Sequence, residues 1–247
     1  MRQFGLIGRS LRHSFSQTYF TQKFYSQNLA EHRYDLFELE SLRELPALLA
    51  TNPDLVGLNV TIPYKETVVT YLDELASSAS RVGAVNVIER LPDGRLRGHN
   101  TDVVGFRESL RRFFPTTADA RALVLGTGGA AKAVVVALNE LGIAHWSVTR
   151  NPLGSGLTYD DLTAQLLAAH QLIINATPVG TSPNVEECPN IPYSALTEDH
   201  HLYDLVYNPT ETLFMAKGKQ MGAHVKNGFE MLCLQAEAAW EIWNNEQ

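Results

Sequence analysis

The alternation of short apolar runs with amphipathic stretches predicts an α/β protein of two domains. Residues 4–8, 55–60 and 122–125 are apolar runs of strand length, and stretches with helical spacing of apolar residues lie between such runs. A glycine-rich turn follows the third run directly, at residues 126–131. The 247 residues suffice for two modest domains that each bury a core.

The first hundred residues are predicted to alternate strands and helices. Pro63 fits the first turn of a short helix. Pro92-Asp93-Gly94 is typical of a hairpin turn between two strands. The predicted strands are residues 4–8, 34–39, 55–60, 84–89 and 96–99, and the longer helices are 16–29 and 42–50.

The second part of the chain repeats this alternation, and we expect parallel sheets. A helix over residues 101–114 is the candidate connection between the domains. The predicted strands here are residues 122–125, 144–149, 172–176 and 202–206, with helices at 130–141, about 159–168 and 228–243.

Composition restricts the partners. The formal net charge of −7 and the absence of a basic run argue against a nucleic-acid partner. No stretch reaches the roughly 20 apolar residues of a membrane span, and the N-terminus lacks a signal-peptide pattern. Cys188 and Cys233 lie far apart, which favours reduced thiols and a soluble cytoplasmic protein. The eight histidines form no H-x-x-x-H pair, so no metal site is expected.

The sequence Gly126-Thr127-Gly128-Gly129-Ala130-Ala131 fits G-x-G-x-x-A between a predicted strand and a predicted helix. Gly126 permits the tight turn, Gly128 lets the backbone approach a pyrophosphate, and Ala131 keeps helix and strand close. The helix N-terminus offers unpaired N–H groups to the phosphates. A dinucleotide site is predicted, and a tight turn without a ligand is the alternative.

The end of the next strand indicates which dinucleotide binds. NAD enzymes usually carry Asp or Glu there for the ribose 2′-hydroxyl, whereas Arg accommodates a 2′-phosphate. The chain reads Thr149-Arg150-Asn151, with no acid within reach. A guanidinium can bind the phosphate with two charge-assisted hydrogen bonds, so NADP is favoured. Arg150 as an ordinary surface residue is the alternative.

Polar side chains gather at the ends of the predicted elements in the first half. Ser14 and Ser16 stand where the first helix begins, and they could cap it or bind a carboxylate. Residues 57–65, 83–86 and 98–102 add three asparagines, hydroxyls, Lys65 and Asp102. Each loop alone could be turn chemistry, but together they indicate a binding site.

Seven motifs in order along the chain resemble the shikimate dehydrogenase family. They are residues 5–16 (G-x-x-G…HSxS), 59–65 (NVTxPxK), 83–87 (GAVNT, with Val87 in place of Thr), 98–105 (GxNTDxxG), the glycine loop 126–131, 175–180 (NAT-x-x-G) and 227–236 (NGxxMLxxQA).

The resemblance implies a substrate-binding catalytic domain of residues 1–102 plus about 226–247 and a Rossmann-type NADP-binding domain of residues 103–225. It implies reversible NADPH-dependent reduction of 3-dehydroshikimate to shikimate, in the chorismate route to aromatic amino acids. Lys65 and Asp102 would be the catalytic pair. The substrate would contact Ser14, Ser16, Asn59, Thr61, Asn86, Asp102, Tyr207 and Gln235. The cofactor would contact Gly126, Thr127, Gly128, Gly129, Ala130, Thr149, Arg150, Thr177, Val206 and Gly228, with Tyr207 and Gly228 near the nicotinamide.

Elementary chemistry favours the same pair. Reduction of a ketone puts negative charge on its oxygen, so a proton donor or a cation is needed nearby. Lys65 supplies both, and Asp102 can position it and hydrogen-bond a substrate hydroxyl. A structural ion pair is the alternative for these two residues.

Two departures from the family pattern concern the cofactor. The family reads Asn-Arg-Thr where this chain has Thr149-Arg150-Asn151, so the neighbours of Arg150 are exchanged. The helix that normally follows is nearly absent, since Pro152-Leu153-Gly154-Ser155-Gly156 is a predicted loop. An enzyme that accepts quinate or NAD, and a non-catalytic NADP sensor, therefore stay as alternatives. A monomer and a homodimer are both compatible with the sequence.

Overall fold

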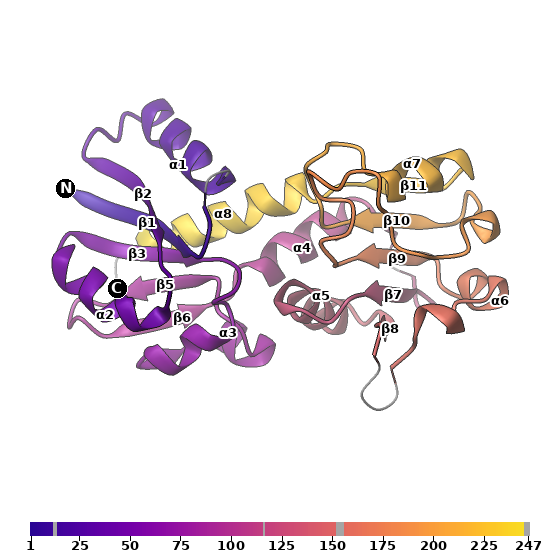
Figure 1. The fold of residues 1–247 in the computed structure, drawn as a ribbon, viewed down its shortest axis with the longest axis horizontal. Coiled ribbons are helices and arrows are strands. Elements are labelled where there is room, and N and C mark those ends of the chain that lie inside the picture. The colour runs from indigo at the N-terminus through magenta and orange to yellow at the C-terminus, as the bar shows by residue number, and fades with distance from the viewer. Residues whose placement is uncertain (12–13, 116, 152–155, 245–247) are drawn as a thin grey trace. The chain divides into compact units, whose positions relative to one another are not determined.

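The computed structural model describes residues 1–11, 14–115, 117–151 and 156–244. The chain divides into two compact units: Met1–Thr101 with Ala236–Gln247, and Asp102–Gln235. Each unit contains one β-sheet flanked by helices (Figure 1). The α/β fold class predicted from the sequence is confirmed. No helix among the described residues has the length and apolarity needed to cross a bilayer.

The first unit contains a six-stranded sheet in the order β2-β1-β3-β5-β6-β4. Its strands are β1 (Arg2–Gly8), β2 (His32–Glu38), β3 (Leu55–Val60), β4 (Glu74–Leu75), β5 (Val87–Arg90) and β6 (Leu96–His99). Strand β5 runs antiparallel to both β3 and β6. The expectation of a parallel sheet was therefore wrong here, because the hairpin predicted at residues 92–94 reverses the chain. Gly94 has a φ of 87°, and Asp93 Oδ1 accepts from Arg95 N at 3.0 Å.

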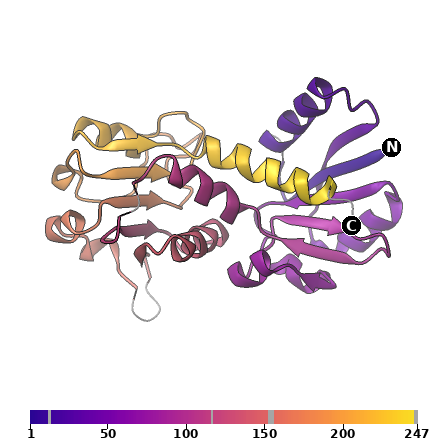
Figure 2. The same ribbon diagram turned by 180° about the vertical axis from the view of Figure 1, so that it is seen from behind.

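Helices cover both faces of this sheet. Helix α1 (Phe15–Ser26) and the last part of α8 (Phe229–Asn244) pack on one face around Phe4, Val87 and Trp243 (Figure 2). The 3₁₀ turn Leu42–Glu44, α2 (Leu45–Thr51), the 3₁₀ turn Thr67–Tyr71 and α3 (Ser77–Val82) supply side chains to the core on the other face. A Cβ on Gly57 would lie 2.1 Å from Trp243 Nε1, so α8 requires a glycine at this point of β3.

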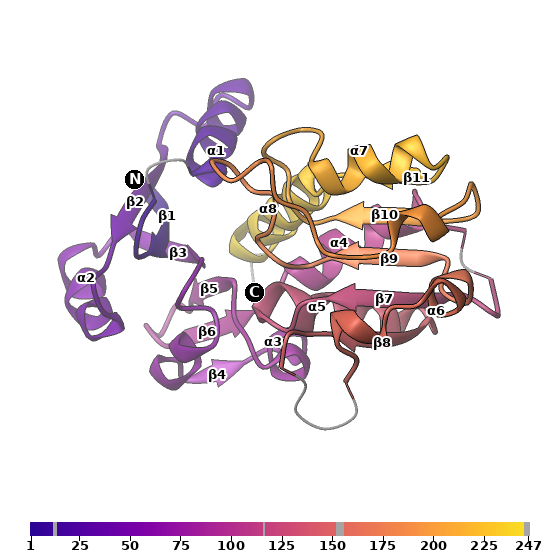
Figure 3. The ribbon, with the colours of Figure 1, turned by 45° about the vertical axis from the view of Figure 1, so that its right-hand side comes forward.

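The second unit contains a five-stranded sheet in the order β11-β10-β9-β7-β8, and every pairing is parallel (Figure 3). Its strands are β7 (Arg121–Leu125), β8 (Ala144–Val148), β9 (Leu172–Asn175), β10 (His201–Asp204) and β11 (His224–Lys226). The helices are α4 (Asp102–Arg111), α5 (Gly129–Glu140), α6 (Ala164–Ala168), α7 (Leu213–Gln220) and the start of α8. The sheet order reverses at β7, which has β8 on one side and β9 on the other. This is the place where open parallel sheets bind ligands.

Three local predictions were wrong. Pro63 lies in a turn closed by Tyr64 N–H on Thr61 O (2.9 Å), and the next helical turn begins only at Thr67. The helix expected over 42–50 begins as a 3₁₀ turn, and α2 starts at Leu45 with a proline in its first turn. The helix expected at 159–168 is a 3₁₀ turn, Tyr159–Asp161, followed by α6. Strands β4 and β11 and helices α3 and α7 had not been predicted.

Candidate active site and cofactor site

One edge of the first sheet collects the predicted substrate residues of this unit. Strands β1, β3 and β6 end at this edge, and the antiparallel β5 begins there. The loop after β1 leads to Ser14 and Ser16, and Asn59 lies at the end of β3 with Thr61 just beyond it. Asn86 directly precedes β5. The hairpin places Asn86 beside Asn59, because Asn59 pairs with Val87 across the two strands.

A buried chain of neutral hydrogen bonds fixes this edge. Tyr34 Oη donates to Asn59 Oδ1 at 2.6 Å, and Asn59 Nδ2 donates to the Asn86 carbonyl at 3.3 Å. Asn86 Nδ2 donates to Thr101 Oγ1 at 3.0 Å, while its Oδ1 accepts from Thr101 N at 2.7 Å. Buried amides bonded in this way have defined orientations. We name the set Tyr34, Asn59, Asn86 and Thr101 the amide network.

Tyr34 was not among the predicted site residues. It is buried on β2, and burial raises the pKa of its phenol while a hydrogen bond with Ser16 opposes that effect. The phenol therefore stays protonated and acts as a neutral donor. Ser16 and Asn59 both lie at its oxygen. No local motif marks Tyr34, because only the pairing of β2 with β1 and of β1 with β3 brings its hydroxyl to Asn59.

Ser14 has the helix-cap role that was one of its two predicted readings. It is the N-cap of α1, and its Oγ accepts from Gln17 N at 3.4 Å. The cap uses the oxygen as an acceptor, so the hydroxyl proton can still be donated to another group. Capping and carboxylate binding are therefore compatible at Ser14.

Lys65 is attached to the amide network through its backbone. Its carbonyl accepts from Val85 N at 2.7 Å, one residue before Asn86. The Tyr64 hydroxyl donates to the Leu39 carbonyl at 2.5 Å and anchors the same turn. Asp102 directly follows Thr101, is the first residue of α4 and is 6% exposed. Lys65 is thus linked to the network by a backbone hydrogen bond to the residue before Asn86, and Asp102 by being the next residue after Thr101.

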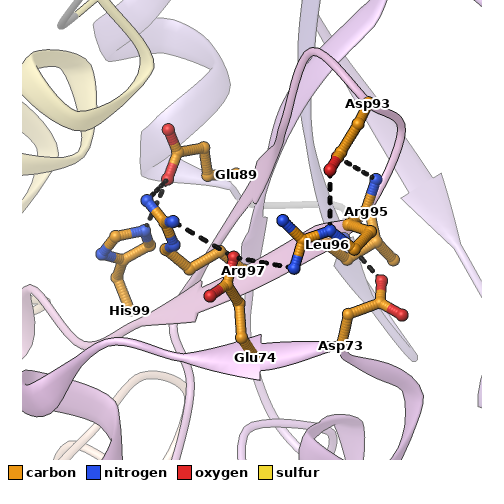
Figure 4. Close-up of polar contacts among 8 residues, drawn as sticks. All are labelled: Asp73, Glu74, Glu89, Asp93, Arg95, Leu96, Arg97 and His99. Atoms are coloured by element: carbon orange, nitrogen blue, oxygen red, sulfur yellow. Dashed lines mark hydrogen bonds and ion pairs between the residues drawn. The ribbon is translucent and has the colours of Figure 1, made fainter. Parts of the chain in front are cut away.

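Charged side chains hold β6, which leads to Thr101 (Figure 4). His99 Nε2 lies 2.9 Å from Glu89 Oε2 on β5, and Arg97 lies between Glu89 (3.7 Å) and Glu74 (3.1 Å). Leu96 N donates to Asp73 Oδ2 at 2.7 Å. Because these contacts tie β6 to its neighbours on both sides, the position of Thr101 is set by the sheet.

The second unit contains a cavity of about 590 Å³ at the ends of β7, β8 and β9. This volume is in the usual range for small-molecule sites. Six predicted cofactor residues line it: Gly126, Thr127, Gly128, Thr149, Arg150 and Thr177. The lining also includes residues that were not predicted: Val148, Tyr159, Ala176, Pro178, Val179, Cys188, Pro189 and Asn190. Several of these follow β9, so the end of that strand was the available signal.

The glycines of the loop have different tasks. Gly126 has a φ of 107°, and a Cβ there would lie 3.0 Å from Thr177 Cγ2. Only glycine takes this conformation readily. Gly128 is the N-cap of α5 with an ordinary φ of −74°, and a Cβ there would meet nothing within 4 Å. Gly126 is therefore needed for the fold of the turn, whereas Gly128 leaves space in front of the helix N-terminus.

A buried carboxylate organises two of the loops around this cavity. Asp204 is 0% exposed and accepts from Asn175 Nδ2 (2.9 Å), Val206 N (3.0 Å) and Thr212 Oγ1 (2.6 Å). Asn175 Oδ1 in turn accepts from Thr177 N at 3.1 Å. Burial raises the pKa of Asp204 to about 6 although the hydrogen bonds oppose it. We name Asn175, Thr177, Asp204 and Thr212 the carboxylate network.

The remaining predicted residues lie outside the lining of the cavity. Gly129 and Ala130 form the first turn of α5, and Val206 is buried behind Gly228, whose N–H it accepts at 3.1 Å. A Cβ on Gly228 would lie 2.1 Å from the Leu205 carbonyl, so packing alone requires this glycine. Tyr207 is 36% exposed, and Gln235 is buried in α8 close to Gly105 of α4.

The described side chains include no group of three or more His, Cys, Asp or Glu that could hold a metal ion.

Comparison with known proteins gives one family. Residues 6–88 match the shikimate dehydrogenase substrate binding domain. The shikimate dehydrogenase (NADP(+)) of Clostridium beijerinckii is 37% identical, over 100% of this chain and 93% of the relative. The Thermus thermophilus shikimate 5-dehydrogenase, solved with NADP(H) and shikimate, is 31% identical with a TM-score of 0.87 and covers 100% and 94% of the two chains.

A quinate dehydrogenase from Corynebacterium glutamicum, solved with NAD, is also similar. It is 28% identical, with a TM-score of 0.87 over 99% of this chain and 94% of the other. The resemblance inferred from the seven motifs is thus confirmed by relatives that match over the whole chain. This chain belongs to the shikimate dehydrogenase family.

Proposed function

We propose that the protein is a shikimate dehydrogenase that reduces 3-dehydroshikimate to shikimate reversibly with NADPH. The amide network is the observation that carries this proposal. It holds Asn59 and Asn86 at one sheet edge. Lys65 is tied to the residue before Asn86 by a backbone hydrogen bond, and Thr101, which hydrogen-bonds Asn86, directly precedes Asp102 in the chain. In this reading residues 1–102 with about 226–247 bind the substrate, and residues 103–225 bind NADP.

The cavity of the second unit fits a dinucleotide phosphate. The open space at Gly128 suits a pyrophosphate, which the N-terminus of α5 attracts through its N–H groups. Thr149 and Arg150 follow β8, where a 2′-phosphate is bound in this type of fold. Gly126, Thr127, Gly129, Ala130, Thr177, Val206 and Gly228 complete the proposed cofactor set. NADPH, when bound, supplies the hydride for the substrate ketone.

The substrate would be held by hydroxyl and amide groups. Ser14 and Ser16 donate to its carboxylate, and Thr61 and Tyr207 belong to the same set. Asn59 and Asn86 are oriented by the amide network, so they would meet the ring hydroxyls without reorganisation. Gln235 completes the set from α8.

Lys65 and Asp102 would perform the proton chemistry. The Lys65 ammonium stabilises the negative charge that develops on the carbonyl oxygen and donates a proton to it. The Asp102 carboxylate would accept a hydrogen bond from the adjacent substrate hydroxyl. In the direction of shikimate oxidation, the neutral Lys65 amine would remove the hydroxyl proton and become the ammonium. The alternative of a structural ion pair predicts no effect of either residue on turnover.

The test is steady-state oxidation of shikimate and of quinate with NADP⁺ and with NAD⁺. Shikimate with NADP⁺ should give the highest kcat/KM. Quinate with NAD⁺ as the preferred pair would contradict the proposal and favour a quinate dehydrogenase. NADP⁺ binding without turnover of either substrate would instead indicate a sensor. A cytoplasmic location and an active monomer or homodimer remain predictions from the sequence.

A further inference from the structure

Beyond Arg150, the chain pairs with the second sheet again at Leu157. Leu157 forms a parallel bridge with Val148, and its N–H donates to the Ser147 carbonyl at 3.0 Å. Thr149 N donates to the Leu157 carbonyl at 2.9 Å. The chain therefore runs along the free edge of β8, where parallel open sheets usually carry a further strand. This pairing brings the next residues to the cofactor cavity.

Tyr159 is the side chain that this return places on the cavity wall. It begins the 3₁₀ turn Tyr159–Asp161 and lines the same cavity as Thr149 and Arg150. The turn is fixed by Asp161, whose Oδ2 accepts from both Thr158 N and Thr158 Oγ1 at 2.7 Å. Asp161 thus directs its negative charge to Thr158. Tyr159 therefore has a defined position.

The two ends of the Tyr159 side chain have different surroundings. Its ring packs against the second unit's apolar core, which includes Leu162 and Leu167. The phenol end is affected by two opposing influences. Burial raises the pKa of the Tyr159 hydroxyl, and the positive charge of Arg150 lowers it. The net shift is upward, so the hydroxyl keeps its proton and can donate it. Within the described part of the chain, no residue takes that proton in a hydrogen bond.

We propose that the Tyr159 hydroxyl is a second ligand of the cofactor's 2′-phosphate, alongside Arg150. The proposal rests on the function proposed above. It assigns a neutral donor to a site where the family motif has Thr and this chain has Asn151. A hydrogen bond to a phosphate oxygen is charge-assisted and so exceeds a neutral one in strength. The ring packs against the core of the second unit.

The test uses Tyr159→Phe, which removes the hydroxyl and keeps the ring in the core. The probes are adenosine 2′,5′-bisphosphate and AMP, titrated by calorimetry without turnover. Affinity for the bisphosphate should fall about tenfold, at the low end for a hydrogen bond to a charged group. Affinity for AMP, which lacks the 2′-phosphate, should change less than about twofold. In kinetics, the KM for NADP⁺ should rise with kcat unchanged.

Tyr193→Phe is the matched control. Tyr193 packs against the same core, and its hydroxyl donates to the Pro189 carbonyl at 2.8 Å, but it does not line the cavity. This variant should bind both probes like the wild type. The double variant Arg150→Ala with Tyr159→Phe tests the shared ligand, because two groups on one phosphate should show non-additive losses.

Three results would overturn the proposal. Unchanged binding of the bisphosphate by folded Tyr159→Phe would mean that the hydroxyl does not contact the phosphate. Equal losses for both probes would assign Tyr159 to the adenosine. Strictly additive losses of bisphosphate affinity in the double variant with Arg150→Ala would mean that the two side chains do not share one phosphate. If the wild type itself does not prefer the bisphosphate over AMP, the NADP preference of the proposed function fails instead.

Discussion

The two sheets both end in a buried polar network, but the networks differ in charge. The amide network of the first unit consists of amides and hydroxyls, and its hydrogen bonds leave the asparagines oriented. The carboxylate network of the second unit centres on Asp204, which is completely buried. The first network includes Asn59 and Asn86, which we propose as substrate ligands. The second lies behind a glycine loop and positions backbone.

This difference follows from what each site has to bind. A ring with several hydroxyls needs donors and acceptors in fixed directions, and oriented neutral amides provide both. A pyrophosphate needs close approach of N–H groups, which only missing side chains allow. The first unit therefore holds side-chain donors and acceptors in fixed directions. The second unit instead keeps the space in front of a helix N-terminus free of side chains. Four experiments test or refine this contrast.

The largest effect is expected at Lys65, the cation that the first unit adds to its neutral network. Lys65→Met keeps the length of the side chain but removes the charge. The kcat for shikimate oxidation should fall about 10²–10⁴-fold with a much smaller change in substrate KM. Asp102→Asn should impair both parameters, and the double variant should be little worse than the poorer single one.

Lys219→Met is the control, since Lys219 is exposed and pairs only with Glu211 (3.2 Å) among the described ion pairs. Its kinetics should match the wild type. A folded Lys65→Met enzyme with more than about a tenth of wild-type kcat would fall short of general acid–base catalysis. The reaction would then proceed without a cation from Lys65, and the role given to the first unit in this comparison would be wrong.

The charge difference between the networks predicts different responses to pH. Burial raises the pKa of Asp204 from 3.8 to about 6, so the folded state favours its protonated form. Its contribution to stability is fully present below the unfolded pKa and is lost as pH rises through about 6. Asp204→Asn cannot titrate. The whole shift is worth about 3 kcal/mol, and the wild type should lose about half of that unfolding free energy relative to this variant between pH 5 and pH 7.5.

Urea denaturation of both proteins between pH 5 and pH 7.5 measures this difference. Tyr34→Phe is the counterpart in the amide network. It removes a buried donor from Asn59 and should cost about 1–2 kcal/mol. That cost should not vary over the same pH range, because Tyr34 keeps its proton there. Parallel stability curves for wild type and Asp204→Asn would show that Asp204 does not titrate in this range.

The glycine loop allows fold and binding to be separated. Gly128→Val places atoms in open space, with no backbone strain at a φ of −74°. The Kd for NADP⁺ should rise at least about tenfold, while the unfolding free energy stays within about 1 kcal/mol of the wild type. Gly126→Ala should instead reduce stability by at least about 1 kcal/mol, because its φ is 107°. Calorimetric titration and urea denaturation give the two quantities. Wild-type affinity in folded Gly128→Val would refute the pyrophosphate assignment.

The smallest effect is expected at Ser14, where capping and substrate binding overlap. Ser14→Asp keeps a good N-cap but adds a negative charge beside the proposed carboxylate. Repulsion of about 1 kcal/mol should raise the substrate KM about fivefold and leave NADP⁺ affinity unchanged. Thr163→Asp is the control, because Thr163 caps α6 in the same way, accepting from Leu166 N at 3.2 Å. Equal KM values for both variants would return Ser14 to a purely structural role.

Much of the fold was predictable because it depends on local patterns. The apolar runs that became β1, β3, β7 and β9 stand out by themselves, and the turn at 92–94 contains the residues its geometry demands. The glycine loop was found for the same reason, since strand, turn and helix are contiguous there. Predictions failed where the local conformation depends on contacts with residues far away in the sequence. The turn at Pro63, for example, is anchored by Tyr64 to the Leu39 carbonyl of another loop.

The sequence by itself determined the α/β class, the glycine loop and, through seven motifs, the family. Tertiary structure alone decided which side chains support these elements. Tyr34 reaches Asn59 only because β2 pairs with β1. Asp204 becomes a buried acid only because Asn175 and Thr212 converge on it, and Gly228 is required only because Leu205 lies against it. The physical reason is that periodicity and turn chemistry act between neighbours in the chain. Burial, pKa and hydrogen-bond satisfaction depend instead on residues that the fold brings together.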